Sequence, residues 1–350
     1  MGACRTFGAC GVMAVILLFA RGADPRAQAV PRSAATRLDP ATVILNAFES
    51  YPVVALGEGP HGNEQGHAFR LSLIRDPRFT AVVNDIVVES GSARYQDLMD
   101  RWVQGESVPE PELLRAVRED TVTPTPAWDR LIYEETFRAV RDVNRSLPPA
   151  RRLRILLGDP PIDWREVRTA DEYRGWLRQR DSHPAALIQR EVLAKGRRAL
   201  IVYGDGHFQA RSERPGRSLV GILETAGTHV FTITTTFADL SPFQGDVSSW
   251  MLPGLARLTG TFIGAAPYEV FFGPPPPVEF FKANPNIEDH YDAVLVLGTP
   301  SSLRLAPLAY PRCTEPDYVR MRLMRMTLAG MPPSGDRLTK ECEAAAALQR

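Results

Sequence analysis

Four short apolar segments of the sequence are each followed at once by side chains that can hold or transfer a proton. In chain order these side chains are Glu58 and His61, then Glu89, then Asp159 and Asp163, and finally Asp205 and His207. A histidine with an ordinary pKa near 6.5 can take a proton from water at neutral pH, and a nearby carboxylate can fix its tautomer and make it more basic. Because Glu58 lies three residues before His61, the pair predicts a general base that activates water for hydrolysis.

The segments that must position these residues have the composition of buried strands. They are short, rich in β-branched residues and nearly continuous in apolar character, which is typical of strands covered on both faces. The six segments are 53–56, 86–89, 154–158, 199–204, 229–234 and 293–298. Helical patterns separate them, so we predict an α/β fold with a mostly parallel central sheet flanked by helices.

A parallel sheet would bring these ionisable residues together at one of its edges. Ligands of such sheets bind outside the carboxyl ends of the strands, where the loops converge. The first four predicted strands all end in titratable side chains, so we expect one polar site at that edge. We expect Asp159 and Asp205 to contact the substrate there.

Two further segments would shape the site. Residues 92–144 carry no strand signal and have helical spacing, which predicts a helical cap after the second strand. The segment "FFGPPPPVEFF", residues 271–281, must be an extended loop, because successive prolines are excluded from helices and from sheet ladders. Neither segment identifies a substrate.

The N-terminal 29 residues have the pattern of an export signal. A basic start at Arg5 is followed by the apolar run 11–20 and by "AQA" at 27–29, a small-x-small cleavage pattern. We therefore predict an exported protein, periplasmic or extracellular, with no stable membrane insertion after cleavage; an uncleaved anchor is the alternative. We expect a lead-in at 30–50, the main domain at 51–300 and a C-terminal extension at 301–350.

Cysteine content predicts a disulfide, and the charge limits the classes of partner that the protein could bind. Of four cysteines, only Cys313 and Cys342 lie outside the predicted signal, and an oxidising compartment would join them in a disulfide. The chain has 41 basic and 41 acidic residues without a dense basic cluster, which argues against nucleic acid as a partner. A small-molecule substrate fits better, and the sequence is silent on oligomeric state.

Several motifs occur in an order that resembles the erythromycin-esterase-like family, which belongs to a superfamily with the ChaN-like haem-binding and TraB/Tiki proteins. They are "GExxHG" at Gly57 to Gly62, Arg70, the strand-ending Glu89, "WVQG" at Trp102 to Gly105, "GD" at Gly158 and Asp159, "GxxH" at Gly204 to His207 and "YDAVLVL" at Tyr291 to Leu297. The resemblance implies a hydrolytic site with Glu58 and His61 at its core and Arg70, Glu89 and His207 around it. One departure is Gly204, which stands where the esterases have the first histidine of "HNxH".

Three functions remain open at this point. The first is an exported ester or lactone hydrolase with His61 as base and no cofactor. The second is a metal-dependent hydrolase or peptidase, in which His61, His207, Glu58 and Glu89 would bind a divalent ion that activates water. The third is a haem- or iron-binding protein that uses a His or a Tyr, such as Tyr203 or Tyr310, as axial ligand.

The same residues also have purely structural interpretations. Glu58 and His61 could cap a helix that begins near Pro60, a residue suited to a first helical position. Arg70 could form a salt bridge at the surface or the sheet edge, Glu89 could be an exposed carboxylate at a strand end, and Asp159 could form a turn. No "GxSxG" motif occurs in the sequence, so a covalent serine mechanism is disfavoured.

Overall fold

The computed structural model describes residues 31–209, 217–243, 247–273, 284–331 and 335–347. The predicted export signal, residues 1–29, lies outside the described residues. So do positions 274–281 of the predicted proline-rich loop. From Arg32 onward the chain forms a single unit.

Seven strands form one sheet, in the order β3-β2-β4-β1-β5-β7-β6. The strands are β1 (Val53–Gly57), β2 (Asp85–Ser92), β3 (Arg154–Asp159), β4 (Ala199–Tyr203), β5 (Val230–Thr236), β6 (Gly254–Arg257) and β7 (Ala293–Val296). All neighbours are parallel except β6, which runs antiparallel to β7. The predicted α/β fold and its six strands are confirmed. The edge strand β6 was missed because its four residues, "GLAR", carry too few apolar side chains to stand out.

Alternate residues of each strand point to opposite sides of the sheet, and both sides are buried. Val54 and Leu56 of β1 belong to one apolar cluster, whereas Val53 and Ala55 belong to another. This burial on two faces is the reason that the strand sequences are continuously apolar. The sheet is thus the middle layer between two layers of helices.

The helical layers differ in their origin along the chain. One face is covered by α1 (Pro40–Ala47), α2 (Glu64–Arg75), α3 (Phe79–Val82), α4 (Gln96–Val103), α5 (Glu110–Glu119) and α6 (Leu131–Arg145). The other is covered by α8 (Ser182–Glu191) and α9 (Leu219–Thr225). The short helix α10 (Glu269–Phe272) packs against the same apolar cluster as α8 and α9 through Val270 and Phe271. The helix α7 (Ala170–Leu177) lies outside these layers. No helix among the described residues is both long and apolar enough to cross a membrane.

The helices predicted after β2 are present as α4, α5 and α6. They bury Met99, Trp102, Leu114 and Phe137 in the core on one face of the sheet. The loop that joins α5 to α6, residues 120–130, leaves this layer and reaches the carboxyl ends of the strands. There its Val122 N–H donates to Asp159 at the end of β3, at 2.6 Å.

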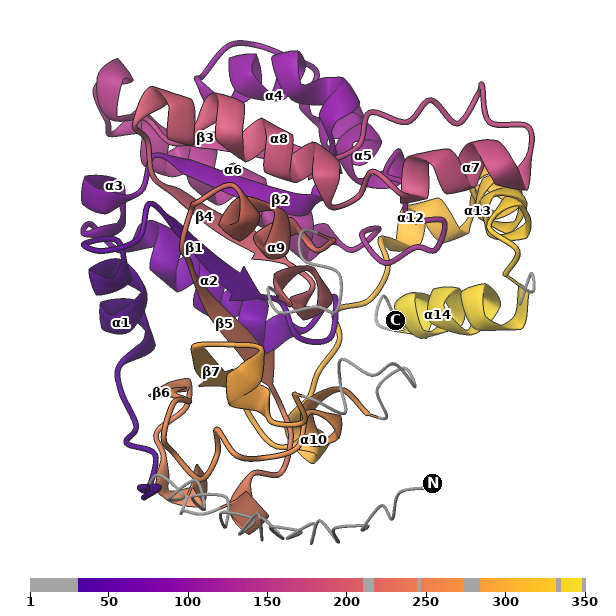
Figure 1. Cartoon of the computed structure of the whole chain (residues 1–350). Helices are drawn as coiled ribbons and strands as arrows, with labels where there is room; N and C mark the ends of the chain where they lie inside the picture. The colour runs from indigo at the N-terminus through magenta and orange to yellow at the C-terminus, as the bar shows by residue number, and fades with distance from the viewer. Residues whose placement is uncertain (1–30, 210–216, 244–246, 274–283, 332–334, 348–350) are drawn as a thin grey trace, which may run out of the picture. The chain divides into compact units, whose positions relative to one another are not determined.

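The C-terminal region folds into α12 (Tyr310–Cys313), α13 (Pro316–Leu328) and α14 (Gly335–Ala347). In Figure 1 these helices lie beside α7, on the side toward which the arrow of β2 points. A disulfide joins Cys313 in α12 to Cys342 in α14, as the sequence predicts. Tying α12 to α14 restricts the unfolded chain and so stabilises the folded arrangement of these short helices.

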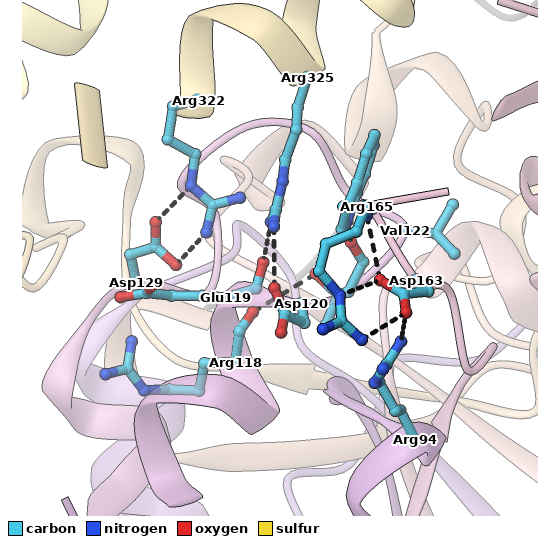
Figure 2. A network of polar contacts seen from close by, with 12 residues as sticks. Arg94, Arg118, Glu119, Asp120, Val122, Asp129, Asp163, Arg165, Arg322 and Arg325 are labelled. Carbon is cyan, nitrogen blue, oxygen red and sulfur yellow. Dashed lines mark hydrogen bonds and ion pairs between the residues drawn. The ribbon is translucent and has the colours of Figure 1, made fainter. Parts of the chain in front are cut away.

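Buried arginines of α13 bind the α5–α6 loop (Figure 2). Arg322 donates to Asp129 from Nε at 2.8 Å and from Nη2 at 2.5 Å, and both side chains are 1% exposed. Arg325 donates from Nη2 to Asp120 at 2.8 Å and also bonds the carbonyl of Glu119. We call these contacts the α13 clamp. They fix the loop to the C-terminal helices.

The α13 clamp should be a large contributor to stability. Replacing Asp129 by Ala leaves the buried Arg322 guanidinium without its counter-charge, which costs about 3–5 kcal/mol of unfolding free energy. Chemical denaturation of the purified protein measures this loss. Arg320→Ala is the matched control, because Arg320 lies on the same helix with its side chain 78% exposed, and it should leave the midpoint nearly unchanged. Equal midpoints for Asp129→Ala and wild type would contradict the clamp.

Candidate active site

The predicted site residues meet at the carboxyl ends of β1, β2 and β4, as the strand pattern predicts. Glu58 and His61 follow β1, Glu89 lies in β2, and His207 follows β4. Together with Arg180, three of these residues line a cavity of about 610 Å³, a size that suits a small-molecule ligand. The three are His61, Glu89 and His207.

His61 is held by a buried carboxylate. Its Nδ1 lies 2.8 Å from Oε2 of Glu58, whose side chain is 4% exposed, while the His61 side chain is 37% exposed. An ionised carboxylate only accepts hydrogen bonds, so this contact places the ring proton on Nδ1 and leaves the lone pair on Nε2. Nε2 is therefore the atom that can take a proton.

Arg70 contacts the Glu58 carboxylate that holds His61. Its side chain is 5% exposed, and Nη2 lies 3.5 Å from Oε1 of Glu58. The guanidinium supplies a counter-charge to the second oxygen of the carboxylate that orients His61. Arg70 thus contacts the carboxylate that holds the His61 ring.

The turn after β1 does not form the helix start that was predicted near Pro60. The helix α2 begins at Glu64, and Asn63 is its N-cap, with Oδ1 accepting from Gly66 N–H at 2.6 Å. The Asn63 amide also donates to the carbonyls of Glu58 and Pro60 at 2.7 Å each. Asn63, not Pro60, therefore starts the helix and closes the turn that carries His61, so the capping interpretation of Glu58 and His61 was wrong.

An aromatic wall closes one side of the His61 ring. Trp128 of the α5–α6 loop packs edge-on against it, with ring centroids 4.4 Å apart, and Tyr133 packs against Trp128 at 5.2 Å. The Tyr133 hydroxyl accepts from Gly62 N–H at 2.9 Å. Trp128 is 1% exposed, so this side of the imidazole is shielded from water.

Glu89 is the centre of a second charged group. Its Oε1 bonds Nη2 of Arg180 and lies 3.4 Å from Nε2 of His207, and its Oε2 accepts from Gly204 N–H at 2.7 Å. His207 in turn bonds Asp181 through Nδ1 at 2.7 Å. Two cationic groups therefore flank one buried carboxylate at the cavity wall.

Gly204 allows the two groups to approach each other. A Cβ atom at this position would lie 3.1 Å from Cε1 and 3.3 Å from Nε2 of His61, and 3.3 Å from Oε2 of Glu89. Such distances are tighter than ordinary van der Waals contacts. The glycine that departs from the esterase pattern is thus the position over which His61 and Glu89 converge.

The charges shift the pKa values of both histidines upward. Burial lowers the pKa of His61, but its hydrogen bond to Glu58 and the charges of Glu58, Glu89 and Asp205 outweigh this effect and raise it above 6.5. Burial also lowers the pKa of His207, yet Glu89 and Asp181 raise it to about 10. At neutral pH His207 is therefore an imidazolium and a hydrogen-bond donor, so it cannot serve as the base.

Asp205 lies within the cavity wall, but its carboxylate is already occupied. It accepts hydrogen bonds from Gly59 N–H, the Thr234 hydroxyl and Thr235 N–H at 2.8–2.9 Å, and it is 5% exposed. These bonds join the turn after β1 to β5. The geometry favours a structural role for Asp205 in place of the predicted contact with substrate.

Asp159 is deeply buried and only partly satisfied. Its Oδ2 accepts from Val122 N–H, whereas Oδ1 has no hydrogen-bond partner and lies 3.9 Å from Nε of Arg180. Burial raises the pKa of Asp159 to about 8, more than the nearby Arg180 lowers it. Asp163 lies apart from this group and pairs with Arg94 and Arg165.

The metal-binding alternative does not fit these contacts. Glu58 and Glu89 each bond a different histidine, and His207 is engaged at both ring nitrogens. In the part of the chain that the structure describes, no three His, Cys, Asp or Glu side chains are grouped so that they could hold a metal ion. We therefore derive no step through a divalent ion at this site.

The haem alternative does not fit at Tyr203. This residue is 1% exposed, and its hydroxyl lies so close to Gly158 that a Cβ there would be 1.9 Å away. Such a hydroxyl has no room for an iron atom beside it. The side chain of Tyr310 lies outside the described residues.

Sequence reasoning missed Arg180, Asp181 and Trp128. Arg180 and Asp181 lie between α7 and α8, and Trp128 lies in the α5–α6 loop. None of them follows a strand or belongs to a recognisable motif, so no pattern in the sequence marked them. Only the packing of the loops brings them to the site.

No protein-family model and no curated protein sequence matches the chain. Among solved structures, a mutant of the erythromycin esterase EreC in its open conformation has a TM-score of 0.50 at 11% identity, covering 76% of this chain and 94% of that one. A Bacillus cereus protein has a TM-score of 0.46 at 12% identity, covering 79% and 96%. The ChaN protein of Campylobacter jejuni, solved with cofacially bound haem, has 0.38 at 13%, covering 58% and 88%. The likeness to the erythromycin esterase, at 11% identity, supports a shared fold and nothing more specific.

The raised pKa of Asp159 predicts a pH dependence of stability. Between the unfolded value near 3.8 and the folded value of about 8, the folded protein holds a proton that the unfolded chain releases, so stability falls as pH rises through this window. Denaturation of wild type and Asp159→Asn between pH 5 and pH 8 measures the difference. The variant should show a shallower decline, and parallel pH curves would refute the assignment.

Proposed function

We propose that this protein is a hydrolase of ester or lactone bonds that uses water activated by His61. The observation that carries the proposal is the contact between His61 Nδ1 and the buried carboxylate of Glu58, at 2.8 Å, which leaves Nε2 as the base at a cavity. The fold shared with an erythromycin esterase is consistent with this proposal.

In the proposed reaction, His61 Nε2 accepts a proton from water as the water oxygen bonds to the carbonyl carbon of the ester. The carbonyl oxygen becomes an oxyanion, which the positively charged His207 and Arg180 stabilise from the cavity wall. The intermediate then expels the alcohol oxygen, which takes the proton back from His61. The products are a carboxylic acid and an alcohol, and the base is regenerated.

The described residues offer no thiol nucleophile for a competing covalent mechanism. The cysteines beyond residue 10 are Cys313 and Cys342, and they are joined to each other. This supports direct attack by water. We also propose an exported, oxidising location for the protein, supported by this disulfide and by the N-terminal sequence pattern.

Activity should depend on the base. His61→Ala should lower hydrolysis of an aryl ester such as p-nitrophenyl acetate by about 10²–10⁴-fold, the usual contribution of a general base. The turnover of wild type should survive treatment with a chelator. His229→Ala, at an exposed histidine far along the chain, is the control and should retain full turnover. Undiminished turnover in His61→Ala would reject the mechanism.

The pH profile should report the pairing of His61 with Glu58. In wild type the acidic limb of kcat/KM follows deprotonation of His61, whose pKa is raised above 6.5 by Glu58. In Glu58→Gln the negative charge is lost while burial remains, so the pKa falls and the limb moves to lower pH. An acidic limb that stays in place in Glu58→Gln would show that another group sets the profile.

A further inference from the structure

A second cavity, of about 510 Å³, also has His61 in its wall. It lies between the α5–α6 loop and the C-terminal helices. Besides His61, its lining is Thr125, Pro126, Ala127 and Arg130 from the loop, with Leu305, Met326, Met331, Leu338 and Glu341 from the C-terminal region. Its volume is within the range of ligand pockets.

The chemistry of this second cavity is mainly apolar. Six of its side chains are Pro, Ala, Leu or Met, and its two charged groups neutralise each other, with Arg130 Nη2 bonded to Glu341 Oε2 at 3.0 Å. Burying a charged ligand group there would cost free energy without a free counter-ion. The cavity therefore suits an uncharged apolar chain or ring.

The position of His61 connects this cavity to the chemistry. His61 lines both cavities, so a carbonyl carbon within reach of a water on its Nε2 would lie beside both. A substituent on one side of an ester bond can then extend into the second cavity, while the other side remains in the first cavity near His207 and Arg180.

The walls of the second cavity depend on long-range contacts. The α13 clamp holds the loop that carries Ala127 and Arg130, and Met326 belongs to α13 itself. Leu338 and Glu341 belong to α14, which the disulfide at Cys342 ties to α12. The C-terminal helices therefore build this cavity.

We infer that the second cavity is a specificity subsite for an uncharged apolar group joined directly to the scissile ester bond. The inference rests on the proposed function, because it takes the reacting carbonyl to lie at His61. Either the acyl side or the alcohol side of the ester could supply the apolar group, and the two are separated by experiment.

The test compares two substrate series. One contains p-nitrophenyl esters from acetate to octanoate, and the other contains acetate esters from methyl to octyl. In one of the two series, kcat/KM of wild type should rise about fourfold for each methylene that becomes buried. The series that rises identifies the side of the ester that enters the cavity, and two flat series would overturn the inference.

A space-filling variant links the preference to this cavity. Leu305→Trp adds bulk at a lining residue that is 51% exposed, so folding should tolerate it, and the rise with chain length should flatten. Leu177→Trp is the matched control at a 42% exposed leucine on α7 and should keep the rise. A slope that is the same in Leu305→Trp and wild type would place the preference elsewhere.

Direct binding separates this inference from the proposed function. Calorimetry with 1-octanol, an uncharged apolar probe, should show binding to wild type and to Leu177→Trp, and at least tenfold weaker binding to Leu305→Trp. If no ester is hydrolysed but 1-octanol binds in this way, the proposed function fails and the cavity assignment stands. If esters are hydrolysed without a chain-length preference and 1-octanol does not bind, the cavity assignment fails alone.

The disulfide provides a second variant. In Cys313→Ser with Cys342→Ser, α14 is no longer tied to α12, so the ratio of octanoate to acetate turnover, or the matching alkyl ratio, should fall. A reducing agent should lower this ratio in wild type and have no effect on the double variant. An unchanged ratio in the double variant would overturn the dependence of the cavity on the C-terminal helices.

Discussion

The buried carboxylate of Glu58 is the interaction on which the site depends. A carboxylate removed from water costs several kcal/mol unless charged or hydrogen-bonding groups compensate it. Here His61 contacts one oxygen and Arg70 lies near the other, so the same contacts that satisfy the charge also orient the His61 ring. Loss of either partner would leave the carboxylate under-compensated, which links stability to chemistry at this position.

The second charged group shows how several titratable side chains share one buried space. Glu89 is ionised because His207 and Arg180 face it, although burial opposes ionisation. Asp159 lies beside the same arginine but beyond hydrogen-bonding distance, and it remains protonated at neutral pH. Two cations, Arg180 and His207, thus face two carboxylates, because His207 also bonds Asp181. The group is held together by alternating charges at the cavity wall.

Much of the fold and part of the site followed from the sequence. Both faces of the sheet are buried, as Val54 on one face and Ile201 on the other illustrate. The strand sequences are therefore continuously apolar, which predicts the parallel sheet. The strand-end residues Glu58 and Glu89 meet at one edge of the sheet because the carboxyl ends of parallel strands lie there.

Arg180 and Trp128 reach the site through loops, whose paths depend on tertiary packing and leave no periodic signal in the sequence. Asp205 lies at a strand end as predicted, and its oxygens accept hydrogen bonds from two backbone N–H groups and from the Thr234 hydroxyl.

The α13 clamp also bears on the order in which the protein is completed. Asp129 and Arg322 are 193 residues apart in sequence. Asp129 belongs to the α5–α6 loop, which also carries Trp128. During synthesis the sheet and the Glu58 contacts can form before the last helices exist, since domains are made from the N-terminus onward. Until α13 emerges, Asp129 lacks its Arg322 partner, although Arg118 of α5 can already bond the Trp128 carbonyl, at 3.0 Å in the finished fold. A growing chain can therefore form the Glu58–His61 contact before the second cavity has its C-terminal wall, because Met326, Leu338 and Glu341 are made last.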